Sequence, residues 1–246
     1  MPSLRAVSRL LAITLSMFAC ITSRAAPDDF RVLSDDMPDA GKTEAELQLA
    51  YTKPPRRDEH RSPVLQSLLE VSYGLTPLWE VSVQLPGTRL DGTWHLTGVN
   101  LETQFISSGN EPGFYWGARI EVARGGAPGE PLAWGSEWRP ILGWHAGPWH
   151  VIANPGVEVP LSGPERQAHF VPYAKVSRRV GDDTHLGVEY FAEAGTLRRF
   201  WPANQRSEWL LAVIDTELAG TELHFGIGKG LTSGSDSWVM KMRVAY

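Results

Sequence analysis

The chain has 246 residues, with 23 Lys and Arg against 28 Asp and Glu, so its formal net charge is −5. This balance gives no basic excess for binding nucleic acid, and a single cysteine excludes a disulfide framework. No stretch reaches the ~20 apolar residues of a membrane-spanning helix, although the chain contains 10 Trp, 6 Tyr and 8 Phe.

Residues 1–25 have the pattern of an export signal. Arg5 and Arg9 are positive, residues 10–21 form an uncharged apolar run, and small residues end at Ala25, after which we expect cleavage. Cys20 lies inside this segment, so the mature chain would carry no thiol. Lipidation of Cys20 is the alternative, although the residues before it fit that signal poorly.

The next seventeen or so residues differ from everything that follows them. Residues 26–42 are polar, acidic and without periodicity, which predicts a flexible periplasmic segment. From residue 44 onward, apolar and polar side chains alternate with period two, the pattern of half-buried strands. We expect about twelve strands, at residues 44–51, 69–73, 79–85, 98–105, 114–122, 138–144, 149–159, 170–179, 186–193, 208–217, 222–228 and 238–246.

The connections between these strands alternate in length. Tight connections follow every second strand, at residues 74–77, 107–113, 145–148, 181–184 and 218–221. The others are mostly longer, as at residues 52–63, 124–136 and 195–206. Outer-membrane barrels have short periplasmic turns and longer external loops. The sequence therefore predicts an all-β, antiparallel, up-and-down transmembrane β-barrel over residues 43–246, with its last strand paired to its first; a soluble all-β domain is the alternative.

Apolar faces toward lipid would place the charged faces in the lumen. These candidate lumen residues are Glu70, Glu80, Glu102, Arg119, Glu121, Arg139, Lys175, Arg179, Glu189, Glu193, Glu222, Lys241 and Arg243. They could form a polar path for a solute or a closed interior of paired charges. About twelve strands enclose less space than the 16–18 strands of wide porins, which favours a narrow or closed lumen.

The tryptophans fall mostly near the ends of the expected strands, as in aromatic girdles at membrane interfaces. The alternative for each is stacking on a ligand at the barrel mouth. Arg198, Arg199 and Trp201 lie together in a long external loop, where they could contact lipopolysaccharide phosphates or an incoming anion; a solvated loop is the alternative.

Four sequence pieces resemble one family of outer-membrane proteins. They are YGLTPLWE at residues 73–80, LP at 85–86, NPGVE at 154–158 and GIGKGLTSGSDSW at 226–238. Together they are similar to the barrel family named after the meta-pathway of phenol degradation, whose members are described as transporters. The resemblance runs from about residue 73 to the end and implies a barrel; it does not identify a cargo.

Three patterns that suggest chemistry have simpler interpretations. His60 and Ser62 have the spacing of outer-membrane phospholipases, but the residues after them do not match. His145 and His150 flank a tight turn and could hold a metal ion, but no acidic residue is close in sequence, which favours imidazoles at a turn surface. The glycines of residues 226–230 resemble a phosphate loop only in spelling, since no helix follows. We therefore expect no catalytic residue, no metal and no cofactor.

The whole pattern predicts an exported protein of the outer membrane of a Gram-negative-type envelope. Its expected function is that of a narrow channel or transporter-like barrel for a small molecule. An outer-membrane enzyme, acting on lipid or peptide, and a closed structural barrel are the alternatives. The expected partners are outer-membrane lipid, lipopolysaccharide and, through the C-terminal strand, the barrel-assembly machinery.

Overall fold

The computed structural model describes residues 30–55, 62–108 and 112–246. The expected export signal with Cys20, and His60 of the phospholipase-like pattern, lie outside these residues. The strands are β1 (Thr43–Lys53), β2 (Val64–Thr76), β3 (Trp79–Leu90), β4 (Thr93–Leu96), β5 (Gly98–Ile106), β6 (Gly113–Gly125), β7 (Ala133–Ala146), β8 (Trp149–Pro160), β9 (His169–Arg179), β10 (Thr184–Glu193), β11 (Gly195–Thr196), β12 (Arg199–Phe200), β13 (Ser207–Leu218), β14 (Thr221–Gly230) and β15 (Trp238–Ala245).

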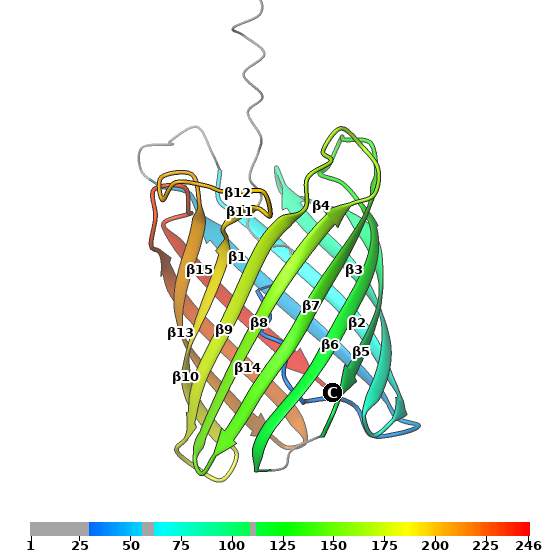
Figure 1. The fold of residues 1–246 in the computed structure, drawn as a ribbon, viewed down its shortest axis with the longest axis vertical. Helices are drawn as coiled ribbons and strands as arrows, with labels where there is room; N and C mark the ends of the chain where they lie inside the picture. The colour runs from blue at the N-terminus through cyan, green and yellow to red at the C-terminus, as the bar shows by residue number, and fades with distance from the viewer. Residues whose placement is uncertain (1–29, 56–61, 109–111) are drawn as a thin grey trace, which may run out of the picture.

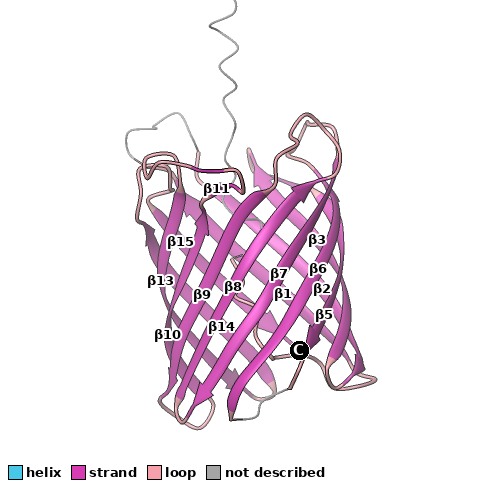
Figure 2. Cartoon of the chain, in the orientation of Figure 1, coloured by secondary structure: helices cyan, strands magenta, loops and turns pink. Residues whose placement is uncertain are grey.

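Twelve of these strands form a closed antiparallel barrel (Figures 1 and 2). Each pairs with its neighbours along the chain, and β15 pairs with β1 to close the ring, for example at Met242 and Leu49. The three short strands β4, β11 and β12, which the sequence pattern did not predict, extend hairpins at one rim. The predicted up-and-down barrel of about twelve strands, closed through its last strand, is therefore confirmed.

The two ends of the barrel differ in the length of their connections. Four tight turns, at residues 77–78, 147–148, 180–183 and 219–220, lie at one end together with the C-terminus, where β5 also ends and β6 begins (Figure 1). We call this the short-turn end and the opposite rim the long-loop end. The predicted alternation of short turns and long loops is thus present.

Side chains alternate between an apolar outer face and a polar inner face. On β3, Trp79 and Val83 are exposed on the outside, while Glu80 and Gln84 are buried inside. This arrangement is the inverse of a water-soluble barrel, because polar groups fill the interior and apolar groups cover the exterior. No helix in the described part of the chain is long and apolar enough to cross a membrane.

The tryptophans follow this alternation with one exception. Eight of the ten Trp side chains are exposed on the outer wall or at its rims, and Trp201, in the loop after β12, is half-buried. Trp209 differs, since it is only 2% exposed and points into the lumen from β13. Apolar side chains occupy both faces of this strand, so alternation alone does not show which face points inward. Pairing with β10 shows which face of β13 points inward. Leu211, two residues after Trp209 and so on the same face, lies opposite the buried Glu189.

Residues 30–38 lie mostly buried inside the barrel and residues 39–42 are exposed before β1, in a part of the chain where the sequence predicted a flexible periplasmic segment. Phe30 packs against Phe191 and Trp209, near the long-loop ends of β10 and β13. The chain then runs down the lumen to Ala40, which bridges to Gly74 at the short-turn end. We call residues 30–42 the lumen segment. Its apolar and charged side chains contact partners on the inner wall, which no local periodicity could reveal.

Candidate functional site in the barrel lumen

The upper end of the lumen segment is anchored in an apolar patch of the inner wall. The ring of Phe30 is fully buried, with its centroid 5.3 Å from that of Phe191 and 5.6 Å from that of Trp209, both edge to face. Such pairs add about 0.5–1.5 kcal/mol each to the effect of burial. The Lys241 ammonium donates a hydrogen bond to the Phe30 carbonyl at 2.5 Å. The anchor thus combines apolar packing with one charged hydrogen bond.

A first group of ion pairs surrounds Glu70 on β2. Its carboxylate accepts from Arg31 of the lumen segment at 2.7 Å and from Gln84 at 2.8 Å. Arg119 lies 3.7 Å from the same carboxylate and also pairs with Glu102. Glu70 therefore has partners both on the segment and on the wall, as a buried charge requires.

A second group of ion pairs surrounds Glu189 on β10. Lys241 lies 2.5 Å and Lys175 3.5 Å from its carboxylate oxygens. Lys175 also pairs with Asp215 at 2.8 Å, and Asp215 bonds to the ring of His224. All five groups come from the barrel wall, and Lys241 also connects this network to the lumen segment through its hydrogen bond to the Phe30 carbonyl.

Asn154 on β8 holds the middle of the lumen segment. It is fully buried, its Oδ1 accepts from the Leu33 N–H at 2.8 Å, and its Nδ2 donates to the Leu33 carbonyl at 3.1 Å. The side chain therefore satisfies both backbone groups of one residue, as a neighbouring strand would. Gln104 adds a bond to the Ser34 carbonyl at 3.1 Å.

Arg139 on β7 is buried in the lumen and contacts β9. Its guanidinium donates to the Val171 carbonyl at 2.9 Å and to Glu137, and it stacks over the Tyr173 ring at 3.8 Å. A Cβ at Gly156 would lie 2.7 Å from this guanidinium, so the glycine makes room for it. This explains one glycine of the NPGVE piece.

A cavity of about 600 Å³ opens below these contacts, at the short-turn end. The lumen segment contributes Ser34, Asp35 and Asp36 to its lining. Its wall carries both cations and anions, among them Lys175, Asp215 and Arg243, with His145, His150, His185, Arg179, Asp182, Asp183, Glu217 and Glu222. A small polar molecule or hydrated ion fits this volume and meets charges of both signs.

Asp35, His145 and His150 converge at the side of this cavity. Asp35 Oδ2 lies 2.9 Å from His145 Nε2, and its other oxygen lies 3.7 Å from His150 Nε2. The two imidazole rings stack with their centroids 3.9 Å apart. The Tyr115 hydroxyl hydrogen-bonds to His150 Nε2 at 2.8 Å. The lumen segment thus supplies the acidic partner that the sequence around the histidines lacks.

The thirteen candidate lumen residues are distributed over three environments. Glu70, Glu80, Glu102, Arg119, Arg139, Glu189 and Lys241 are buried in the interior, and the side chains of Lys175 and Arg243 are only 12% and 19% exposed. Glu121 and Glu193 are half-buried. Arg179 and Glu222 are exposed at the mouth of the cavity.

Sequence reasoning missed several charged partners inside the barrel. Glu46 lies 3.4 Å from Arg243 and 3.7 Å from Arg31. Its alternation with Leu47 was visible on the first strand and could have identified it. Arg31 and Asp35 carried no such signal, because the segment that holds them has no periodicity.

The three external-loop candidates lie on and beside the small β11–β12 hairpin. Arg198 and Arg199 are exposed, while Trp201 is half-buried and packs edge to face on His169 at 5.4 Å. In the loop before β9, the Gln167 and Arg166 backbone N–H groups both donate to Glu165 and hold the pKa of that carboxyl below its usual range.

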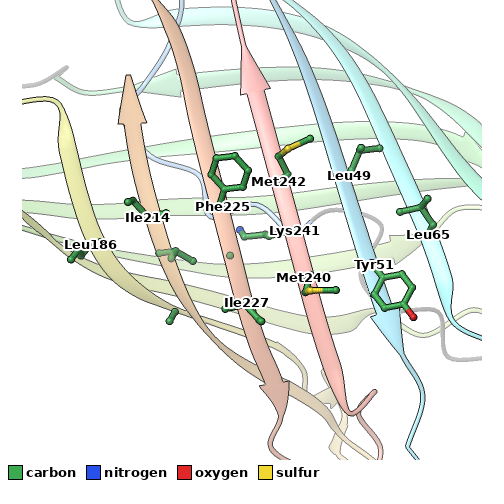
Figure 3. Close-up of a pocket in the computed structure, with 13 residues that line it drawn as sticks. Leu49, Tyr51, Leu65, Leu186, Ile214, Phe225, Ile227, Met240, Lys241 and Met242 are labelled. Carbon is green, nitrogen blue, oxygen red and sulfur yellow. The ribbon is translucent and has the colours of Figure 1, made fainter. Parts of the chain in front are cut away.

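The outer wall carries a shallow apolar groove of about 620 Å³ across β10, β13, β14, β15, β1 and β2 (Figure 3). Phe225, Met240, Met242 and Tyr51 line it from the outside. Lys241, which also borders it, extends inward to Glu189. The groove therefore offers hydrocarbon side chains to whatever surrounds the barrel.

Two solved structures share this fold over most of the chain. An outer membrane channel from Pseudomonas putida F1 superposes with a TM-score of 0.62 and 14% identity, over 90% of this chain and 98% of the channel. The NanC porin superposes with a TM-score of 0.55 and 12% identity, over 82% of this chain and 97% of the porin. No family model matches the sequence, and no curated protein matches it significantly. These similarities show a barrel of the kind found in outer-membrane proteins.

Proposed function

We propose that this protein is an outer-membrane barrel that binds or passes a small polar molecule through its lumen, and that the lumen segment closes the path. The supporting observation is that the wall networks keep partners when the segment is removed. Glu70 retains Arg119 and Gln84, and Glu46 retains Arg243. A barrel whose wall charges are balanced in this way can release its segment without isolating a buried carboxylate.

The side chains on the outer face of the barrel support a location in the outer membrane. An apolar outer face and exposed tryptophans suit hydrocarbon and its two interfaces. Because outer-membrane barrels have short periplasmic turns and longer external loops, the short-turn end would face the periplasm and the long-loop end would face outward. In this orientation Arg198, Arg199 and Trp201 would contact lipopolysaccharide. The barrel-assembly machinery would recognise β15. An N-terminal export signal and membership of the meta-pathway barrel family complete the proposal.

A closed structural barrel is the second candidate, because the paired charges around Glu70 and Glu189 fill much of the interior. Planar-bilayer conductance separates the two. The mature chain is compared with a variant lacking residues 26–39, which keeps Ala40 and the Gly74 contact. A channel predicts rare or small openings for the intact protein and steady conductance for the deletion variant.

The control is a synthetic peptide of residues 26–42 added to the deletion variant, which should restore the low conductance. A deletion variant that folds, as judged by anomalous migration on an unboiled detergent gel, but conducts nothing would favour the structural barrel instead.

A further inference from the structure

We propose that Asp35, His145 and His150 form a binding site for a divalent transition-metal ion such as Zn²⁺ or Cu²⁺. One ligand atom from each of these residues lies within 4.8 Å of the other two. Imidazole nitrogen and carboxylate oxygen are the ligands that Zn²⁺ takes in proteins, with bonds of roughly 2.0–2.2 Å. A tetrahedral site would separate these atoms by about 3.3 Å, so completing it requires side-chain rotations and release of the Tyr115 hydroxyl from His150 Nε2.

The backbone fixes the two histidines side by side. His145 on β7 and His150 on β8 are directly paired residues across one hairpin. Side chains at such positions project from the sheet in the same direction. The stacked rings, 22° from parallel, confirm that both imidazoles extend into the same space. The wall therefore presents two nitrogen ligands whose positions are set by the sheet.

Asp35 completes the set from the opposite side. Its side chain is only 3% exposed and lies against both imidazoles. One carboxylate oxygen beside two imidazole nitrogens is a ligand set that suits a divalent transition-metal cation. Three protein ligands leave a further coordination position for water or a solute, and the adjoining cavity of about 600 Å³ gives access to it.

This arrangement would couple metal binding to the position of the lumen segment. Two ligands belong to the wall and one to the segment, so the complete site exists only while the segment is in the lumen. A bound ion would therefore hold the segment in place. The metal site itself does not depend on channel function.

Calorimetric titration of the refolded, metal-free mature protein with Zn²⁺ tests the site. We expect one Zn²⁺ per chain, with affinity lower by at least about tenfold in Asp35→Asn and in His145→Ala. His185→Ala is the matched control, because it removes an imidazole from the same cavity but outside the cluster; its affinity should stay within about twofold of the parent.

Cu²⁺ electron paramagnetic resonance provides a second measurement on the same variants. Nitrogen couplings from two imidazoles are expected in the parent and from one in His145→Ala. Absence of saturable binding, or equal affinity of the parent and Asp35→Asn in folded protein, would overturn the proposal. Because neither measurement involves conductance, its failure is distinguishable from failure of the proposed channel.

Discussion

Replacing Asn154 by Ala should loosen the lumen segment without opening the barrel wall. The side chain makes two hydrogen bonds to the backbone of Leu33, at 2.8 and 3.1 Å, and both are lost in the variant. Each neutral hydrogen bond contributes about 0.5–1.5 kcal/mol net. The free energy needed to release the segment should therefore fall by about 1–3 kcal/mol. The population with the segment outside should rise roughly 5- to 140-fold.

Limited trypsin digestion of the mature protein in detergent measures this population. Arg31 lies on the lumen segment with its side chain 13% exposed, so cleavage after it requires the segment to leave. When opening is fast relative to cleavage, the cleavage rate follows the open population. Mass spectrometry follows the fragment that cleavage releases. Its rate of release should be about 5- to 140-fold higher for Asn154→Ala than for the parent protein.

Asn100→Ala is the matched control for this experiment. Asn100 is also a lumen-facing amide with one hydrogen bond, to Gln84 at 3.2 Å, but it does not hold the segment. Its variant should be cleaved at the parent rate. Equal rates for the parent and Asn154→Ala, or equal acceleration by both substitutions, would refute the view that Asn154 retains the segment.

Two further predictions concern the barrel wall. Glu70→Gln should destabilise the folded barrel by about 1.5–3 kcal/mol, because it removes the buried carboxylate that Arg31 and Arg119 share and leaves them only Glu46 and Glu102 as charge partners among the described residues; Glu208→Gln, in a partly exposed pair, should lose at most about 1 kcal/mol. Urea unfolding in detergent compares them, and equal losses would contradict the prediction. Gly143→Ala should cost about 1–3 kcal/mol, because the new methyl group would overlap the buried ring of Tyr115. Gly135→Ala on the same strand meets only a carbonyl oxygen at 3.9 Å and should leave the gel-shift melting temperature unchanged.

The barrel wall could be predicted from sequence because apolar and polar residues alternate along each strand. This alternation shows which side chains point outward and which point into the lumen. Trp79 and Glu80 alternate, and so do Met240 and Lys241, whatever their partners are. Strand β13 shows where this local signal ends. Trp209 and Leu210 are equally apolar, and only the register against β10 turns Trp209 inward.

The interior could be predicted only in part because its pairs join distant positions. The thirteen candidate residues follow from alternation, but their partners do not. Asp35 meets His145 across 110 positions, and Leu33 meets Asn154 across 121. No spacing rule links such residues. A segment without periodicity was therefore expected to be flexible, although its side chains are complementary to the wall.

Apolar packing, more than charge, accounts for the residence of the segment in the lumen. Removing Arg31 leaves Glu70 beside Arg119, so the ion pair can be replaced by one within the wall. Phe30 has no such substitute, since its departure would expose the rings of Phe191 and Trp209 to water. Burying one Phe side chain contributes about 1.5–3 kcal/mol. Under the proposed function, a solute with an apolar ring and a charged group would compete for the same patch and the same cations and would displace the segment.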